Sequence, residues 1–361
     1  MLNGKGGKMG LEFLRNRKIL ITGHTGFKGS WLAFWLQKLG ASVTGVALEP
    51  KTSGDAFYAM GISETVNDLR HDINDLHGLK EIINQSAPEV VFHLAAQPLV
   101  LEAIADPLYT LQTNIIGTAN LLEACRTARS VRAIIVITSD KCYENHETGE
   151  PFREGDCLGG NDPYSASKAC AEVITASYRN TYFNPSGSVA VATVRAGNII
   201  GGGDWSENRI VPDCIRALQA NSPLNLRNPG AVRPWQHVLE PLYGYLLLAG
   251  RMLNDKTSYS EAWNFGPPGS ESHSVSELVD RITMYWGGPG IYLHRQLSVN
   301  HEANILRLDI SKARNRLGWE PRLSFEQSVR MTTDWYRAQQ EGMDLKHFTL
   351  QQINFYESIL R

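Results

Sequence analysis

The segment KILITGHTGFKGSWLAFWLQKL, residues 18–39, decides the fold. It opens with a β-branched apolar run that predicts a buried strand, and residues 26–39 have the length and composition of a helix. Gly23, Gly26 and Gly29 mark the turn between the two. Glycines at such a junction permit a tight turn, and the helix N-terminus supplies free N–H groups and the positive end of a dipole. The pattern predicts a dinucleotide-binding turn, and the alternative is a glycine-rich turn without a ligand.

The first half of the chain repeats this alternation of strand and helix. Strands so apolar are buried on both faces, and their alternation with helices predicts an α/β protein with a Rossmann-type, doubly wound parallel sheet. After Ala196 the alternation of strands and helices becomes less regular, which indicates a smaller C-terminal α/β lobe. Further strands are expected at 42–47, 89–94, 132–138 and 188–195, and helices at 109–128, 162–182, 274–285 and 325–339.

The same rhythm predicts the organisation into domains. Residues 1–16 form an N-terminal extension, and residues 17–197 form the dinucleotide-binding domain. A segment at about 235–265 is expected to return to this domain. Residues 198–234 and 266–361 then form the substrate-binding lobe.

The composition excludes several classes of protein. The 361 residues are 42% apolar, enough for a sizeable core, and the formal net charge of −2 offers no field for nucleic acid. The apolar runs are too short to span a bilayer, and the first sixteen residues contain no apolar signal region, so a cytoplasmic protein is expected. Five cysteines without CxxC spacing predict reduced thiols and no metal site.

A tyrosine and a lysine four residues apart, Tyr164 and Lys168, are the first catalytic candidates. On a helix they share one face, and a nearby ammonium group favours the phenolate, which is expected to lower the pKa of the tyrosine toward neutrality. Such a tyrosine can take a proton from a sugar hydroxyl. The pattern alone also fits a surface tyrosine beside a solvated lysine, but here it follows a strand that ends in Thr138 and Ser139.

Two acidic residues are candidates for binding the nucleoside part of a cofactor. Glu49 follows the second expected strand, where a carboxylate binds the adenosine ribose and favours NAD over NADP. No arginine stands beside it in the sequence, and Lys51 is the nearby cation. A solvated surface carboxylate is the alternative for Glu49. Asp72 falls where a third strand should end and is placed to bond the adenine amino group.

Together these motifs resemble the extended short-chain dehydrogenase/reductase family. The resemblance rests on the glycine turn, Leu94-Ala95-Ala96 after a strand, Asn114, Ser139 and the YxxxK pattern, and it extends to residues 309–319. It implies NAD as the cofactor. The cofactor-binding residues that it implies, besides Gly23, Gly26, Gly29, Glu49, Asp72, Tyr164 and Lys168, are Thr25, Phe27, Ile73, Leu94, Ala95, Ala96, Asn114 and Thr138.

Three segments narrow the resemblance to the members that dehydrate CDP-activated glucose to its 4-keto-6-deoxy form. They are residues 139–143, 195–212 and 232–238. The resemblance makes Tyr164 the base at O4, Lys168 a ribose contact, Ser139 an orienting hydroxyl and Asp140 the acid at C6. Related dehydratases have a glutamate where this chain has Lys141, so Lys141 is either the C5 base or a cation that stabilises the enolate.

The same resemblance implies how a CDP-sugar substrate is held. Arginines bind diphosphate oxygens bidentately, although each could instead serve as a surface ion-pair partner. The substrate-binding candidates are Gln97, Asn198, Arg209, Arg233 and His237.

Two other functions stay open from the sequence. A CDP- or UDP-sugar 4-epimerase would need no acid at Asp140, and a non-catalytic NAD sensor would need no tuned tyrosine. The resemblance further implies deoxysugar biosynthesis for lipopolysaccharide O-antigen. It also implies a homodimer, or a higher oligomer, paired through a four-helix bundle of the helices expected at 109–128 and 162–182.

Overall fold

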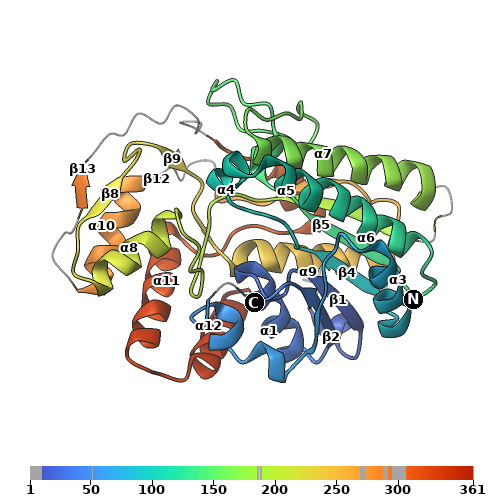
Figure 1. The fold of residues 1–361 in the computed structure, drawn as a ribbon, viewed down its shortest axis with the longest axis horizontal. Coiled ribbons are helices and arrows are strands. Elements are labelled where there is room, and N and C mark those ends of the chain that lie inside the picture. The colour runs from blue at the N-terminus through green and yellow to red at the C-terminus, as the bar shows by residue number, and fades with distance from the viewer. Residues whose placement is uncertain are drawn as a thin grey trace.

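A computed structural model describes residues 10–50, 52–184, 187, 189–268, 273–287, 292–294 and 306–360. Within these residues the centre of the molecule is a seven-stranded sheet in the order β3-β2-β1-β4-β5-β6-β11 (Figure 1). Every neighbouring pair is parallel. The expected doubly wound parallel sheet is confirmed. The strands are β1 (Lys18–Thr22), β2 (Ser42–Ala47), β3 (Asn67–Arg70), β4 (Val90–His93), β5 (Ala133–Ile137), β6 (Ala190–Arg195) and β11 (Ala262–Asn264).

Helices cover both faces of this sheet (Figure 1). One face carries α3 (Leu76–Ser86), α6 (Gly117–Arg126) and α7 (Pro163–Tyr178), and the other carries α1 (Phe27–Lys38), α9 (Leu239–Asn254) and α12 (Leu345–Ile359). Shorter helices are α2 (Ala56–Ala59), α4 (Val100–Ala105) and α5 (Pro107–Leu111). Both faces are therefore buried, which explains why the central strands read as nearly continuous apolar runs.

Both long helices expected in the first half contain a π-helical turn. Gln112–Ile116 separates α5 from α6, and Arg179–Phe183 follows α7. The start of α7 was legible in the sequence, because Asp162 caps it by accepting from the Ser165 N–H and Pro163 fits the first helical turn. This start fixes the register of the two catalytic candidates on α7.

The C-terminal half builds a smaller lobe at one end of the sheet (Figure 1). Its helices are α8 (Ile210–Gln219), α10 (Val275–Trp286) and α11 (Phe325–Gln340). Its strand pairs are β8 (Leu224–Leu226) with β13 (Tyr292–His294), β9 (Val232–Arg233) with β12 (His273–Ser274), and β7 (Ile199–Ile200) with β10 (Gln236–His237). Short helical turns lie at Glu12–Leu14, Ile62–Glu64, Asp140–Cys142 and Ala313–Leu317.

The two halves share one hydrophobic core. Leu14, just before β1, is fully buried in it. The last helix, α12, lies on α1, where the Trp35 indole donates to a Glu357 carboxylate oxygen at 2.8 Å. No helix formed by the described residues is long and apolar enough to cross a membrane.

Candidate active site

The glycine turn connects β1 to α1. At two of its three glycines there is no room for a side chain. Gly23 has φ +76°, and a Cβ there would lie 2.6 Å from the Ala95 nitrogen. A Cβ on Gly29 would lie 2.1 Å from the Gly23 oxygen. Gly26 differs, because its nearest contact would be an ordinary 3.5 Å. Nothing in the described chain requires glycine at position 26, and this open face at the start of α1 fits the close approach of a pyrophosphate.

The other residues predicted to bind the cofactor near this turn gather around it. Thr25 Oγ1 donates to the Leu48 carbonyl at 3.0 Å, and Phe27 is the first residue of α1. Leu94, Ala95 and Ala96 are half-buried at the end of β4. They reach the turn because β4 and β1 are neighbouring parallel strands, whose carboxyl ends meet at one edge of the sheet.

The expectation that no arginine stands beside Glu49 is wrong. Arg70, the last residue of β3, places its Nε 3.0 Å from a Glu49 carboxylate oxygen, and it also pairs with Asp68. The two residues are far apart in sequence, but β2 and β3 are neighbouring parallel strands. Glu49 stays 68% exposed and accessible to a ribose hydroxyl, while Arg70 is neutralised by two carboxylates.

Asp72 and Ile73 follow the end of β3. Asp72 is exposed and accepts from the Asn74 N–H at 2.9 Å, and Ile73 is 4% exposed. The Asn120 side chain binds the backbone oxygens of both Ile73 and Asn74, at 3.1 Å and 3.0 Å. The loop is therefore fixed by α6, with the Asp72 side chain at the surface.

Asn114 and Gln97 are buried and are joined by two hydrogen bonds. The Asn114 amide accepts from the Gln97 N–H at 2.8 Å and donates to the Gln97 carbonyl at 3.0 Å and to Ser167 Oγ at 2.8 Å. The Gln97 amide is bonded to the Leu99 backbone and to Thr110. The two side chains join the loop after β4 to α7. The sequence analysis predicted ligand contacts for them and did not predict this positioning role.

Tyr164 and Lys168 lie one turn apart on α7 and are both buried. Burial raises the pKa of Tyr164 to about 12, against a hydrogen bond with Ser139 and the charge of Arg209. The expected lowering of this pKa toward neutrality is wrong for the chain alone, because burial of Tyr164 outweighs the effects that oppose it. Burial also lowers the pKa of Lys168, to about 8. The Lys168 amine donates to the Ile137 carbonyl at 3.3 Å.

Asp140 is a buried carboxyl next to Ser139, and its charge acts on Tyr164. It is 2% exposed, it accepts from Ser139 Oγ at 3.0 Å through one oxygen, and its Oδ2 has no partner among the described residues. Burial raises the pKa of Asp140, while the charges of Lys141 and Arg233 and the Ser139 bond oppose the rise. A carboxyl whose pKa is raised is better suited to act as a general acid than one with the ordinary value.

The room for Asp140 depends on Gly197, which the sequence did not single out as a site residue. A Cβ on Gly197 would lie 1.6 Å from Asp140 Oδ2. The Gly197 carbonyl accepts from the Gln236 amide at 3.3 Å, so the backbone is tied in place. Gly197 therefore determines where the free oxygen of the carboxyl lies.

We expect Gly197→Ala to lower turnover by on the order of 10²-fold, because the new methyl group displaces the carboxyl of Asp140 from its position. Steady-state kinetics and thermal unfolding together test this prediction. Gly230→Ala is the matched control, since a Cβ there would meet nothing within 4 Å. Wild-type turnover in Gly197→Ala would contradict it.

A buried ion pair behind the site was also missed by the sequence analysis. Glu172 on α7 binds Arg195 at the end of β6 through two bonds of 2.9 Å, and it accepts from Thr138 Oγ1 at 2.5 Å. Arg195 also donates to Tyr143 Oη at 2.7 Å. The network joins α7, β5 and β6, and so fixes Tyr164 relative to Ser139. The sequence carried one indication of this ion pair: Glu172 lies within an expected helix, and Arg195 ends an apolar strand.

Two of the five predicted substrate-binding residues, Arg209 and Arg233, act electrostatically on the catalytic cluster, and a third, Asn198, is adjacent in sequence to Gly197. Arg209, just before α8, donates to Asp204 at 2.7 Å, and its charge acts on Tyr164. Arg233, on β9, acts electrostatically on Asp140. Asn198, with φ +48°, follows Gly197 directly. Arg209 and Arg233 thus bring positive charge to the catalytic cluster.

The structure does not bring His237 to this cluster. It is 0% exposed, and its ring packs edge-on against Trp31 of α1, with centroids 5.7 Å apart. Burial lowers the pKa of His237 to about 3, so it is a neutral core residue. The prediction failed because the sequence does not show whether a histidine on a short strand faces the core or the site.

Comparison with known proteins assigns the family. The sequence model described as GDP-mannose 4,6 dehydratase matches residues 20–332 of this chain. The chain belongs to this family. A relative, the CDP-glucose 4,6-dehydratase of Salmonella typhimurium, is 41% identical over 351 residues, covering 96% of this chain and 98% of that protein.

Solved structures of similar fold include a dehydratase and an epimerase. The dTDP-glucose 4,6-dehydratase DesIV double mutant of Streptomyces venezuelae has a TM-score of 0.75 at 22% identity, covering 91% of this chain and 99% of the other. The epimerase Mth375 of Methanothermobacter thermautotrophicus has a TM-score of 0.79 at 23% identity, covering 92% and 95%. The fold of the GDP-mannose 4,6 dehydratase family is thus shared by dehydratases and epimerases, so the fold does not separate the two reactions.

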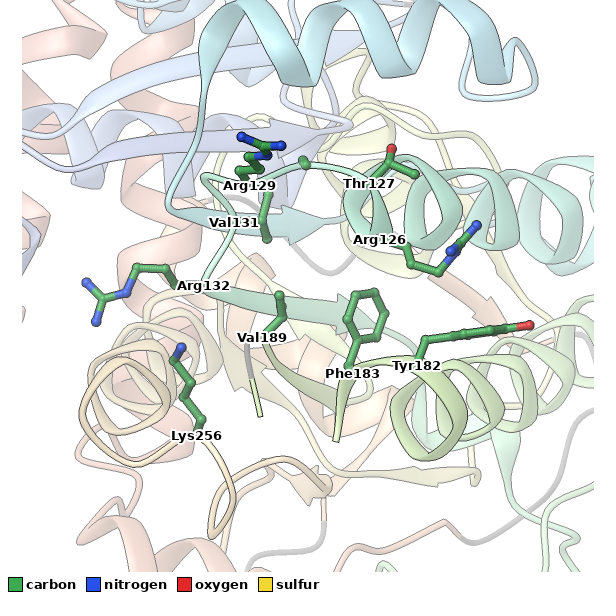
Figure 2. A pocket seen from close by; sticks show the side chains of 10 residues that line it. Arg126, Thr127, Arg129, Val131, Arg132, Tyr182, Phe183, Val189 and Lys256 are labelled. Carbon is green, nitrogen blue, oxygen red and sulfur yellow. The ribbon is translucent and has the colours of Figure 1, made fainter. Parts of the chain in front are cut away.

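A second hollow, of about 650 Å³, lies at the opposite edge of the sheet from this site. It is lined by Val131, Arg132 and Val189, which precede β5 and β6, together with Arg126 and Lys256. Figure 2 shows the Arg126 and Arg132 side chains extending away from one another. They do not converge on one point, so the hollow is not assigned to the substrate.

Proposed function

We propose that this chain is an NAD-dependent lyase that converts CDP-D-glucose to CDP-4-dehydro-6-deoxy-D-glucose and water. The observation that carries the proposal is the buried Asp140 carboxyl, with one oxygen free, beside Ser139 and Tyr164. An epimerase has no need of an acid at this position. The 41% identity to a CDP-glucose 4,6-dehydratase supports the same reaction and the cytidine nucleotide.

NAD fits the residues at the open face of the glycine turn. Gly26 leaves room for the pyrophosphate, Glu49 is exposed for the ribose, and Lys168 is placed for the second ribose. Bound there, NAD would supply the acceptor for the C4 hydride and the donor that returns it to C6, so it would not be consumed. Solved structures of the same fold that are described with bound NAD support this choice of cofactor.

The chain's own residues supply the proton transfers. Tyr164 takes the O4 proton in its phenolate form as C4 is oxidised, and Ser139 and the charge of Arg209 stabilise that phenolate before the transfer. The 4-ketone acidifies the C5 proton, and Asp140 protonates the C6 hydroxyl, which leaves as water. Lys141 either removes the C5 proton or stabilises the enolate. Its backbone N–H donates to Ser139 Oγ at 3.2 Å, which keeps it beside the acid.

Incubation with CDP-glucose, followed by the absorbance of a 4-keto sugar in alkali, tests the proposed reaction. A dehydratase gives the signal, and UDP- and dTDP-glucose in parallel test the nucleotide preference. An isomer of the substrate without the keto signal would assign an epimerase. NAD binding without any product would assign a sensor.

We expect Arg233→Ala to weaken binding of the sugar nucleotide by roughly 1.5–3 kcal/mol, about ten- to hundredfold, because a charge-assisted bond to the diphosphate is lost. The loss should appear mainly in KM. Arg227→Ala is the control, since Arg227 is half-buried and donates to the Asn208 carbonyl in a solvent-exposed hydrogen bond. Unchanged KM with a lowered melting temperature would make Arg233 a structural residue.

We propose further that two chains pair through α5, α6 and α7 in a four-helix bundle. Exposed apolar side chains on this face support the pairing, among them Leu108, which is 76% exposed, Tyr109, Ile116 and Val173. A cytoplasmic location, a role in O-antigen deoxysugar synthesis and the division into residues 17–197 with 235–265, and 198–234 with 266–361, are parts of the same proposal.

A further inference from the structure

A chain of four polar side chains connects the glycine turn to the ends of β2 and β3. The four residues are His24, Asp68, Arg70 and Glu49. His24 Nε2 lies 2.7 Å from Asp68 Oδ1, and the same oxygen accepts a hydrogen bond from Arg70 Nη1. Arg70 Nε lies 3.0 Å from Glu49 Oε1. The guanidinium of Arg70 is therefore held between two carboxylates.

The two carboxylates that bind Arg70 differ in their exposure to solvent. Asp68 and Arg70 are two residues apart on β3, so their side chains point to the same face of the sheet. The Asp68 side chain is 17% exposed, whereas that of Glu49 is 68% exposed. The guanidinium carbon of Arg70 also lies 5.0 Å from the centroid of the Phe57 ring. Asp68 and Phe57 thus hold Arg70 in the protein, and Glu49 binds it from the surface.

Asp68 is itself fixed by His24. A Cβ on Gly45, the β2 residue paired with Asp68, would lie 2.3 Å from His24 Cγ. The imidazole therefore lies over β2, in space that only a glycine leaves open, and it packs edge-on against Phe57 with centroids 5.5 Å apart. Burial lowers the pKa of His24, so at neutral pH its ring adds no charge to the cluster. Asp68 cannot turn away from Arg70 without also losing its hydrogen bond with His24.

The charges of this cluster bear on which nicotinamide cofactor the chain accepts. NAD and NADP differ at the adenosine ribose, where NAD has a 2′-hydroxyl and NADP a 2′-phosphate. An arginine beside the ribose is a suitable partner for that phosphate. Here the one arginine is bound by two carboxylates, so the cluster is negative overall and repels a further anion. A carboxylate accepts several hydrogen bonds, so Glu49 can bind a ribose hydroxyl while it also binds Arg70.

We propose that Asp68 is a specificity-determining residue, which excludes NADP by neutralising Arg70 and holding it away from a 2′-phosphate. The inference rests on the proposed function, which places the adenosine ribose at Glu49. Asp68 acts through Arg70 and leaves Glu49 available to the 2′-hydroxyl of NAD. The preference for NAD then depends on a residue of β3 as well as on the acidic residue that follows β2.

The dissociation constants of NAD⁺ and NADP⁺ for the full chain, measured by calorimetric titration without substrate, test the inference. We expect the wild type to bind NAD⁺ more tightly than NADP⁺. Asp68→Asn should lower the ratio of the NADP⁺ to the NAD⁺ dissociation constant by about tenfold, the scale of one charge-assisted hydrogen bond from the released Arg70. An effect on the glycine turn through His24 would change the binding of both cofactors, and it cancels in this ratio.

Further variants separate an action through Arg70 from a simple loss of charge. The double variant of Asp68→Asn with Arg70→Met removes the phosphate partner as well, and should return the ratio to near its wild-type value. Glu64→Gln is the matched control, because it removes a carboxylate that lies just before β3 and pairs with Lys346, and it should leave the ratio unchanged. Asp68→Ser is a second neutral variant in case Asp68→Asn does not fold.

An unchanged ratio in the neutral variants of Asp68 would overturn the inference and leave the proposed function standing. A gain in NADP⁺ affinity that persists in the double variant would also overturn it, because Arg70 would then not be the phosphate partner. The same holds for a wild type that binds the two cofactors equally. If the wild-type chain binds neither cofactor, the proposed function itself fails.

Discussion

Tyr164→Phe should lower turnover of CDP-glucose by on the order of 10² to 10⁴, the usual contribution of general acid–base catalysis. The phenylalanine ring fills the same buried space, so folding and NAD binding should stay nearly intact. What is lost is the phenolic oxygen, which takes the O4 proton in its phenolate form and bonds Ser139. Steady-state kinetics, with NAD binding and thermal unfolding measured in parallel, give the comparison.

Tyr178→Phe is the matched control for this substitution. Tyr178 is the last residue of α7 and lies outside the site, near Glu123. We expect its turnover to equal that of the wild type. A Tyr164→Phe enzyme within threefold of the wild type would remove Tyr164 from the mechanism.

Asp140→Asn should reduce product formation by a similar factor, but at a different step. Asparagine has nearly the same shape, so it fits against Gly197, yet it cannot protonate the leaving C6 hydroxyl. Oxidation at C4 should still occur in a single turnover. The absorbance of reduced nicotinamide should therefore rise and persist while 4-keto-6-deoxy product nearly stops.

The control for the acid is Asp213→Asn, which removes a carboxylate paired with Arg216 on α8 and should not change turnover. Lys141→Met separates the two roles left open for that residue. Loss of C5 hydrogen exchange with deuterated solvent would make Lys141 the C5 base, and surviving exchange would make it an electrostatic helper. Product at an ordinary rate in Asp140→Asn, without persistent reduced cofactor, would refute the acid assignment.

Most of the sheet was predictable from the sequence, since buried parallel strands are short apolar runs that period and length identify. The strands expected at 132–138 and 188–195 are observed at Ala133–Ile137 and Ala190–Arg195. The π-helical turns after α5 and α7 had no signal, because a single wider turn does not change the apolar period enough to be seen.

The catalytic set was legible wherever its members are close in sequence. Tyr164 and Lys168 are one helical turn apart, and Ser139 and Asp140 are adjacent at the end of a strand. Local geometry alone brings each of these pairs together. Gly197 could not be recognised, since its need for glycine comes from a carboxyl on another strand's loop.

The phosphate turn and the parallel sheet were predictable from local conformation, and the candidate reacting groups from side-chain chemistry and the family resemblance. The electrostatics of the site could be read only from the folded chain. Burial sets the pKa directions of Tyr164, Lys168 and Asp140, and burial depends on every element packed around them. The ion pair of Arg70 with Glu49 also depends on the tertiary structure. The ends of neighbouring parallel strands lie side by side, whatever the separation of the strands along the chain.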